Sequence, residues 1–244
     1  MNIKAVFGTD QGKKRKENQD VVLCSEELKL FAVSDGMGGV LCGKQAAEMS
    51  CTFLKMFFRV VNLFGMEIVE AENTIRDIVM NVSSMIQKTG NEGFHIERYG
   101  ATLTGLCLHN EHAIIFNVGD SRVYLLRSGN SLQQMTRDDN LYELVKEDKD
   151  GIMTELDVNR LQNQLTQFMG MNEGIVPAIQ SIKMKIGDRY LICSDGLTKM
   201  ITDAEIQQIL ETERPLEVQV NQLIEKANEA GGKDNISAIL LEIL

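Results

Sequence analysis

Residues 100–126 read GATLTGLCLHNEHAIIFNVGDSRVYLL, and this stretch decides which kind of sheet the chain can build. Three apolar runs within it, 101–108, 113–118 and 122–126, have the length and the composition of β-strands. Only a few residues separate one run from the next, which is too short for a helical crossover. Consecutive strands are therefore predicted to pair in antiparallel fashion.

The sequence on either side alternates further strands with pairs of helices. Apolar residues recur at helical spacing in the predicted helices 43–63, 67–87, 138–146, 203–210 and 215–230. The remaining predicted strands are 3–9, 21–24, 29–34, 179–186, 189–193 and 236–243. Runs of strands broken by helix pairs exclude a regular βαβ repeat. We predict an α+β fold, in which two antiparallel sheets pack into a central β-sandwich and helices cover both outer faces.

The composition favours one domain over residues 1–244. The chain has 244 residues, of which 43% are hydrophobic, enough for one substantial core. Length alone would also allow two domains, but no Pro/Ser-rich linker interrupts the chain. The segment 147–174 is polar and lacks a regular period, so it is predicted to be an irregular, mobile surface flap.

Charge and cysteine usage narrow the classes of partner. A net charge of −10 repels nucleic acid and anionic lipid, so neither is expected as a partner. The five cysteines form no CxxC pair and mostly lie in apolar runs, which indicates buried, reduced thiols in a cytoplasmic protein. The N-terminus lacks the apolar segment of a signal peptide, and the most apolar stretch, 53–69, contains several charged residues. Membrane insertion is not expected.

Five aspartates stand beside, or within two residues of, glycine, serine or asparagine in short motifs. These motifs are Asn18-Gln19-Asp20, Ser34-Asp35-Gly36, Gly119-Asp120-Ser121, Ser194-Asp195-Gly196 and Asp234-Asn235. Three of them follow predicted strands, where a side chain is fixed in position yet open to a cleft. Converging carboxylates repel one another unless cations lie between them. The pattern therefore indicates a metal site built from oxygen ligands.

Divalent ions such as Mg²⁺ and Mn²⁺ prefer such oxygen ligands. Asp35 could bridge two ions, and Gly36 could present its backbone carbonyl to one of them. Asp195 and Asp234 could complete the shell of the second ion. Two ions about 3.5–4 Å apart would lower the pKa of a bridging water and make it a nucleophile. Each motif alone is equally consistent with a turn or a helix cap, so the hypothesis depends on the whole set.

Arg15 suggests the substrate. It lies five residues before Asp20, in a loop expected to reach the same cleft, and its planar guanidinium can hold two phosphate oxygens. A basic run such as 13–16 is usually a solvated loop. Beside the aspartates it favours a phosphate ester as the substrate.

Six blocks in a fixed order then identify a family resemblance. They are Arg15-Lys16-Glu17-Asn18-Gln19-Asp20, Val33-Ser34-Asp35-Gly36-Met37-Gly38-Gly39, Gly100-Ala101-Thr102-Leu103, Asn117-Val118-Gly119-Asp120-Ser121-Arg122, Leu191-Ile192-Cys193-Ser194-Asp195-Gly196-Leu197 and Gly231-Gly232-Lys233-Asp234-Asn235-Ile236-Ser237. With these blocks the chain resembles the metal-dependent PP2C-type serine/threonine protein phosphatases, and within them the compact bacterial branch.

The resemblance implies a binuclear Mn²⁺ or Mg²⁺ centre in a cleft at one end of the sandwich. Asp35 would bridge both ions, Gly36 would bind the first through its carbonyl, and Asp195 and Asp234 would bind the second. Asp20 would hold metal-bound water near the first ion, and Arg15 would clamp the phosphate. In bacterial relatives a weaker third ion is bound through the aspartate that matches Asp120, with help from the one that matches Asp195.

The resemblance also implies the reaction. Activated water would attack phosphoserine or phosphothreonine directly, without a phosphoenzyme, in a monomer that acts on phosphorylated proteins and opposes a serine/threonine kinase in bacterial signalling. No C-x5-R loop supports a cysteine mechanism instead. At the position of Met37 eukaryotic members often carry a histidine proposed as the general acid, so a metal-bound water is expected in that role here. A catalytically silent binding module and a hydrolase of other phosphate esters remain the alternatives.

Overall fold

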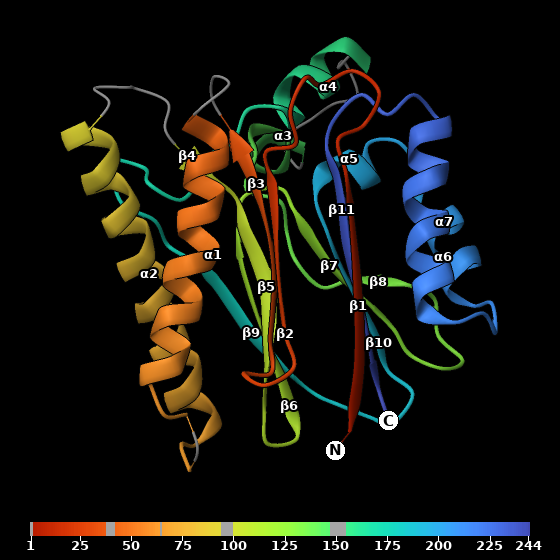
Figure 1. Ribbon diagram of the computed structural model, residues 1–244, viewed down its shortest axis with the longest axis horizontal. Helices are drawn as coiled ribbons and strands as arrows, with labels where there is room; N and C mark the ends of the chain where they lie inside the picture. Colours follow the sequence, from red (N-terminus) through yellow and green to blue (C-terminus); the bar gives the residue numbers. More distant parts are fainter. Residues whose placement is uncertain (1, 38–41, 64, 94–99, 147–154) are drawn as a thin grey trace.

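The computed structural model describes residues 2–37, 42–63, 65–93, 100–146 and 155–244. Within them, two antiparallel sheets face each other and helices cover both outer faces, so that the layers run helix, sheet, sheet, helix (Figure 1). Both termini lie at one end of the sheets, where the backbone N–H of Leu244 donates to the carbonyl of Asn2 over 2.9 Å. The predicted α+β sandwich is confirmed.

The first sheet joins the start of the chain to its end. Its strands, in spatial order, are β1 (Ile3–Asp10), β11 (Ile236–Ile243), β10 (Arg189–Cys193), β7 (Arg122–Leu126) and β8 (Gln133–Gln134). β1 pairs with β11 from Ile3 opposite Ile243 to Asp10 opposite Ile236. This register brings the loop after β1 beside the loop before β11. Helices α6 (Asp203–Leu210) and α7 (Leu216–Glu229) cover the outer face of this sheet.

The second sheet contains the predicted hairpins. Its strands, in spatial order, are β2 (Asp20–Ser25), β3 (Leu30–Met37), β5 (Leu103–His109), β6 (His112–Val118) and β9 (Ala178–Lys183). A short strand, β4 (Gly100–Ala101), pairs with the end of β3. The strand predicted for 101–108 is divided at Thr102. The Asp35 N–H donates to the Thr102 hydroxyl, and the Thr102 carbonyl accepts from the Ser34 hydroxyl, so one bond of the ladder between the two backbones is missing there. Helices α1 (Cys42–Val60) and α2 (Ile68–Gly93) cover the outer face.

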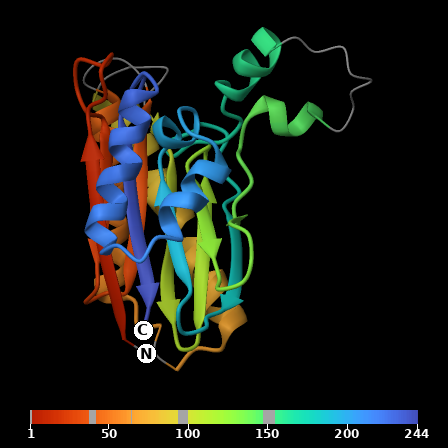
Figure 2. The ribbon, with the colours of Figure 1, turned by 90° about the vertical axis from the view of Figure 1, so that its right-hand side faces the viewer.

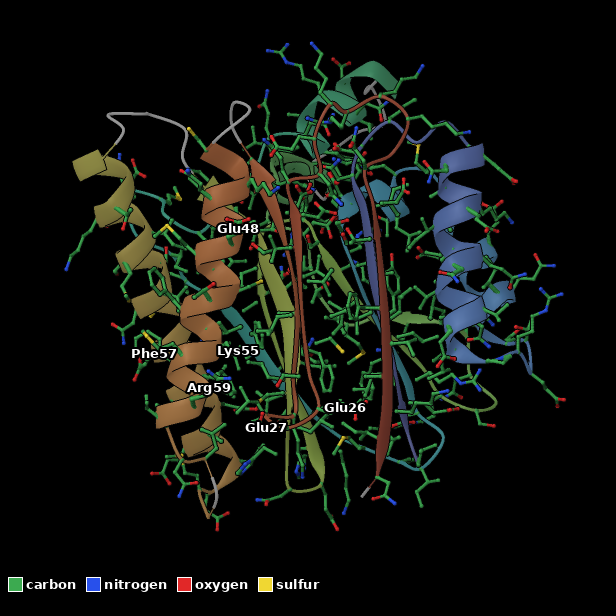
Figure 3. All side chains as sticks on the ribbon, in the orientation of Figure 1. Glu26, Glu27, Glu48, Lys55, Phe57 and Arg59 are labelled. Atoms are coloured by element: carbon green, nitrogen blue, oxygen red, sulfur yellow. The ribbon has the colours of Figure 1, made fainter. Side chains whose placement is uncertain are left out.

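Three apolar clusters hold the four layers together. Phe31 and Tyr190 are fully buried between the two sheets. Leu54 and Ile75 belong to the cluster between the second sheet and its helices, and Phe57 lies on the side of α1 that faces α2 (Figure 3). The third cluster lies between the first sheet and α6 and α7. Strands buried on both faces explain why the central runs read as continuously apolar.

The peripheral helices α3 (Leu141–Val145), α4 (Glu155–Gln162) and α5 (Asp195–Thr198) gather at the end of the sandwich opposite the termini. Figure 2 shows α3 and α4 projecting to one side of the sheets. α3 begins later than predicted because the Asn140 side chain accepts a hydrogen bond from the Glu143 N–H and caps the helix. Helix α5 was not predicted, since four residues carry no periodic signal.

The prediction of an irregular segment at 147–174 is wrong for α4, whereas residues 163–174 form turns and isolated bridges but no helix or strand, as predicted. Met169 is fully buried and pairs with Ala101 as an isolated bridge. The Thr166 N–H donates to the carbonyl of Asp139 over 2.8 Å. Long-range contacts of this kind leave no periodic trace in the sequence, which is why a polar composition was misleading. Residues 147–154 lie outside the described residues, and the flap as a unit stays a prediction.

None of the helices in the described part of the chain combines the length and the apolar composition that a membrane span requires. All five cysteines are free thiols, as predicted.

Candidate active site

A cavity of about 780 Å³ opens at the end of the sandwich that carries α4 and α5. Its wall is built from the loop after β1, the end of β3, the loop after β6, α4, α5 and the loop before β11. The predicted site residues on this wall are Arg15, Asp35, Gly36, Asp120, Asp195 and Asp234. Asp20, the remaining one, lies behind the wall and is only 7% exposed. The fold therefore gathers all the scattered motifs in one place.

Asp35 reaches the cavity from the end of β3. Its backbone N–H donates to the Thr102 hydroxyl over 2.9 Å, and its carbonyl accepts from the Thr102 N–H over 2.8 Å. The next residue must be glycine, because a Cβ on Gly36 would stand 2.3 Å from the carbonyl oxygen of Gly43. The start of α1 can therefore lie directly against the end of β3, which fixes the position of Asp35.

Asp20 stands opposite Asp35 in the β2–β3 pair. The Ser194 hydroxyl donates to Asp20 Oδ2 over 2.7 Å, and Ser194 Oγ in turn accepts from the Ser237 N–H over 2.9 Å. Asp20 Oδ1 is buried and has no hydrogen-bond partner among the described residues. A buried carboxylate oxygen without a donor costs free energy unless a cation or water compensates for it.

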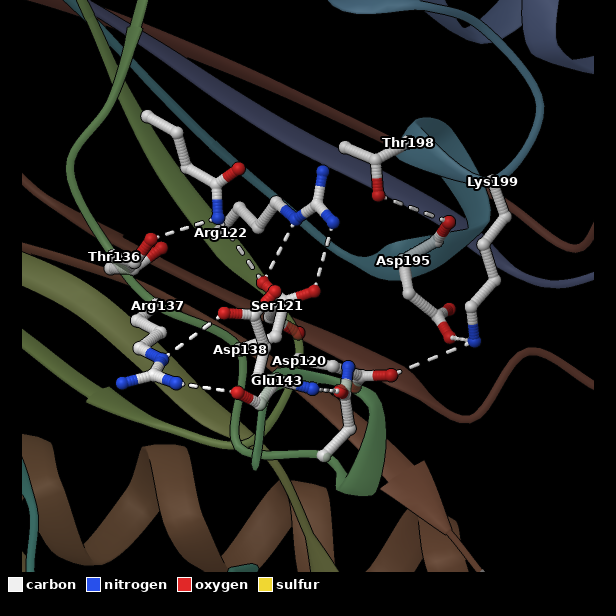
Figure 4. Close-up of polar contacts among 12 residues, drawn as sticks. Asp120, Ser121, Arg122, Thr136, Arg137, Asp138, Glu143, Asp195, Thr198 and Lys199 are labelled. Carbon is white, nitrogen blue, oxygen red and sulfur yellow. Dashed lines mark hydrogen bonds and ion pairs between the residues drawn. The ribbon is translucent and has the colours of Figure 1, made fainter. Parts of the chain in front are cut away.

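Asp195 opens α5 and is 7% exposed, and Asp120, in the loop after β6, is 6% exposed. A Cβ on Gly196 would stand 1.9 Å from the carbonyl oxygen of Asn235, so only glycine lets α5 pack against the loop before β11. Asp195 Oδ1 is a second buried oxygen that lacks a hydrogen-bond partner within the described ranges. Asp195 Oδ2 forms an ion pair with Lys199 (Figure 4).

The loop between β1 and β2 carries Arg15 to the cavity. Asn235 fastens this loop, since its Nδ2 donates to the carbonyls of Gln11 and Glu17 over 2.8 and 2.9 Å. Asn235 Oδ1 also accepts from the Gln19 N–H over 2.9 Å. Arg15 is half exposed, and its Nη2 contacts Asp234 Oδ2 at 2.5 Å. The guanidinium predicted to bind phosphate is therefore present at the cavity, with an aspartate as its partner.

Crowding of carboxylates raises their pKa values. Burial raises the pKa of Asp20 and of Asp120 to about 7, and the charge of Asp195 adds to both shifts. Burial also raises the pKa of Asp35 well above its ordinary range, followed by the charges of Asp20 and Asp195. Burial opposes the charge of Lys199, but Asp195 and Asp120 outweigh it and raise the lysine pKa. The cavity thus holds negative charge that favours a cation.

A further ion pair stiffens the neighbouring wall. Arg122 donates from Nε to Asp138 Oδ1 over 2.9 Å and from Nη2 to Asp138 Oδ2 over 2.8 Å (Figure 4). Its Nη1 also donates to the Tyr124 hydroxyl over 3.0 Å. Because both carboxylate oxygens are engaged, Asp138 is held in one orientation at the edge of the cavity.

The donor set fits hard divalent cations. It consists of carboxylate oxygens and backbone carbonyls, and two buried carboxylate oxygens lack hydrogen-bond donors among the described residues. In the part of the chain that the structure describes, no three acidic, histidine or cysteine side chains already stand as a closed metal shell. The reason is local, since Lys199 and Arg15 hold Asp195 and Asp234 in ion pairs. A divalent ion would replace Arg15 at Asp234, whereas Asp195 still offers Oδ1, which has no hydrogen-bond partner within the described ranges.

Sequence reasoning missed several residues that position the site. Lys199 follows Asp195 by four residues, a spacing that pairs charges on a helix, but α5 itself was not predicted. Ser194, Thr102 and Asn235 stand inside the quoted motifs, yet their side-chain bonds connect segments far apart in the chain. His109 is not among the residues that line the cavity, since it lies at the β5–β6 turn with its Nε2 2.9 Å from the carbonyl of Met66.

Comparisons with known proteins agree with one another. The sequence profile of the family described as protein phosphatase 2C matches residues 7–241. The curated "Serine/threonine phosphatase stp" of Listeria welshimeri is 32% identical over 243 residues, which cover 98% of this chain and 95% of that protein. The solved serine/threonine phosphatase of S. agalactiae is 28% identical, with a TM-score of 0.89 and 100% of both chains covered. The catalytic domain of the phosphatase PstP, solved in complex with two manganese ions, is 26% identical, with a TM-score of 0.84 over 98% of this chain and 97% of that one.

Proposed function

Because this chain belongs to the protein phosphatase 2C family, we propose that it is a metal-dependent phosphatase that removes phosphate from phosphoserine and phosphothreonine in proteins. One observation carries the proposal: four of the predicted aspartates, each from a separate segment, line one cavity together with Arg15, and Asp20 lies behind its wall, paired with Asp35. Among the described residues two of their buried oxygens lack hydrogen-bond partners, as expected of ligands that await a cation.

Asp35, the carbonyl of Gly36, Asp195 and Asp234 would hold two Mn²⁺ or Mg²⁺ ions in this cavity. When bound, such ions lower the pKa of a water and neutralise the charge of a phosphate. The contribution of the chain itself is to hold the proposed ligands in position. Thr102 fixes the backbone of Asp35, and the Ser194 hydroxyl holds the carboxylate of Asp20 through Oδ2. Since these groups are preorganised by the sheets, little reorganisation is needed when the substrate reacts.

Arg15 would bind two oxygens of the substrate phosphate. Its guanidinium is half exposed at the mouth of the cavity, and its planar fork matches phosphate geometry. The ion pair with Asp234 holds the side chain near its target. If Asp234 held a cation, its attraction for Arg15 would weaken, and the guanidinium would be available for the phosphate.

The substrates are phosphorylated proteins, and we propose that a serine/threonine kinase adds the phosphates that this enzyme removes in bacterial signalling. All proposed ligands come from one chain, which supports a monomer and a single catalytic domain over residues 1–244. Five free thiols are typical of proteins in a reducing compartment, so we propose that it acts in the cytoplasm.

The first test measures phosphate release from a phosphothreonine peptide. We expect turnover with Mn²⁺ and none in excess EDTA, because the carboxylates alone cannot activate water. Asp35→Asn removes the charge that would bridge the two ions. Loss of an outer-shell partner lowers activity by up to about 100-fold. Asp35 is a proposed direct ligand, so its loss should lower kcat by more than about 100-fold.

Asp77→Asn is the matched control. Asp77 is exposed on α2, so this substitution removes one negative charge away from the cavity. It should leave kcat and KM unchanged. If the wild-type protein binds Mn²⁺ but releases no phosphate from any phosphopeptide or small ester, the chain is a silent binding module and the proposal is wrong.

A further inference from the structure

Lys199 occupies an unusual position for a lysine next to a proposed metal centre. It follows α5 directly, and its backbone N–H donates to the carbonyl of Asp195 over 2.8 Å. Its side chain turns into the cavity and is only 34% exposed. Figure 4 shows its ammonium nitrogen between the carboxylates of Asp195 and Asp120.

Three oxygen atoms surround the Lys199 ammonium. Asp195 Oδ2 forms a close ion pair with Nζ, Asp120 Oδ2 stands 3.6 Å from it, and Asn163 Oδ1 accepts a hydrogen bond over 2.7 Å. Two of these partners, Asp195 and Asn163, accept hydrogen bonds from the ammonium, and Asp120 adds an ion pair at longer distance. Two carboxylates and one amide carbonyl are also the ligand types that a hard divalent ion takes. The ammonium thus lies where such an ion would otherwise bind.

We propose that Lys199 is a built-in cation between Asp120 and Asp195, at the place where the family resemblance implies a weaker third ion, so that this chain works with two divalent ions. The inference rests on the proposed function, because it presumes the two-ion centre formed by Asp35, Asp195 and Asp234. It goes beyond that function by assigning the third position to a side chain.

Lys199 and a third divalent ion would compete for the same two carboxylates, Asp120 and Asp195. Without a cation, the two buried carboxylates repel each other in a poorly solvated cavity. Lys199 is attached four residues from Asp195, so its effective concentration at the site is high and does not depend on the metal supply. A third divalent ion binds both carboxylates only in the fraction of molecules whose lysine has moved away, and its apparent affinity falls by that fraction.

The contact with Asn163 extends the same role to α4. Asn163 directly follows this helix. Among the described residues, one hydrogen bond from Lys199 Nζ to Asn163 Oδ1 links the end of α4 to α5. Lys199 therefore positions the segment that closes one side of the cavity, while Asp120 and Asp195 hold the lysine. Removing the ammonium should loosen 155–163 together with the pair of carboxylates.

The test counts bound Mn²⁺ by isothermal titration calorimetry and by electron paramagnetic resonance of the free ion. Wild type should bind two ions in the accessible range. Lys199→Gln keeps most of the side-chain length but removes the charge, and it should bind a third ion about tenfold more tightly than wild type does, a size typical of coupled sites. Lys199→Arg keeps the charge and should resemble wild type.

Lys233→Gln is the matched control, because Lys233 is exposed, lines the same cavity and loses the same charge without touching Asp120 or Asp195 in the described structure. It should still bind two ions. If Lys199→Gln and wild type bind the same number of ions with the same affinities, the inference is overturned while the proposed function stands. A wild-type protein that binds no Mn²⁺ and releases no phosphate overturns both.

A measurement on the unaltered chain decides the matter should Lys199→Gln fail to fold. In ¹⁵N-lysine NMR spectra, the Lys199 ammonium signal should stay protected from solvent exchange with two equivalents of Mg²⁺ present. Loss of that protection at two equivalents would mean that divalent ions displace the lysine, and the inference would be wrong.

Discussion

The hydroxyl group of Ser194 links three strands through two hydrogen bonds. It donates to Asp20 Oδ2 at the start of β2 and accepts from the Ser237 N–H in β11. Ser194→Ala leaves the buried Asp20 carboxylate without this donor, and such a loss costs about 1–3 kcal/mol of the free energy of unfolding. Since Asp20 also loses its orientation, kcat/KM should fall by about 10–100-fold. Urea denaturation and peptide turnover measure the two effects.

Ser84→Ala serves as the comparison, because Ser84 is exposed on α2 and its hydroxyl donates to the carbonyl of Met80 within the same helix. Its free energy of unfolding should stay within about 0.5 kcal/mol of wild type. An equal effect of both substitutions would remove the special role of Ser194.

Single residues also show what the sequence could and could not predict about the site. Asp35 and Asp195 were predictable because each ends an apolar strand beside a glycine, which is a local pattern. The role of Lys199 was not predictable, because the direction of its side chain depends on a four-residue helix and on the carboxylate of Asp120 in the loop after β6. Ser194 belongs to a quoted motif, but its bond to Asp20 spans 174 positions and leaves no local trace.

At the scale of elements, the loop between β1 and β2 depends on one side chain at the start of β11. Asn235→Asp keeps the shape of that side chain but removes the amide hydrogens that bond the carbonyls of Gln11 and Glu17. The new carboxylate would instead repel those oxygens, so the loop should detach. We expect faster amide hydrogen exchange in residues 11–19 and a several-fold higher KM, since Arg15 loses its position.

The control for this loop is Asn221→Asp, which makes the same exchange on the exposed side of α7. Hydrogen exchange in 11–19 should not change there. If hydrogen exchange in 11–19 is also unaltered in Asn235→Asp, then β1 and β2 hold the loop without the Asn235 hydrogen bonds.

Elements differed in how well the sequence predicted them, and the reason is where their stability originates. α1, α2, α6 and α7 each bury an apolar stripe against a sheet, so their periodicity was readable. α4 and the residues after it depend on contacts with α3 and on the bridge between Met169 and Ala101. Such tertiary contacts override a polar local composition, and the prediction of an irregular segment failed at α4.

Considered as a whole, the molecule concentrates negative charge at one end of its sandwich. The chain carries a net charge of −10, and burial raises the pKa of Asp20 and of Asp120 to about 7. In an unfolded chain the same carboxyl groups titrate near pH 4. Between about pH 4 and pH 7 the folded, metal-free protein therefore holds protons that the unfolded chain has released. Its stability must fall as the pH rises through this window.

Divalent ions should reverse that slope. They bind the deprotonated carboxylates of the folded state, so with Mn²⁺ the stability should rise from pH 5 to pH 7, while in EDTA it should fall. Thermal unfolding at pH 5, 6 and 7 with EDTA or Mn²⁺ measures both slopes, and carboxylates with lowered pKa values, such as Glu205, are fully ionised in this range and do not interfere. Asp120→Asn removes one of the raised groups and should flatten the EDTA slope. A melting temperature in EDTA that climbs from pH 5 to pH 7 would mean that the carboxylates are not buried together, and the metal centre would lose its physical basis.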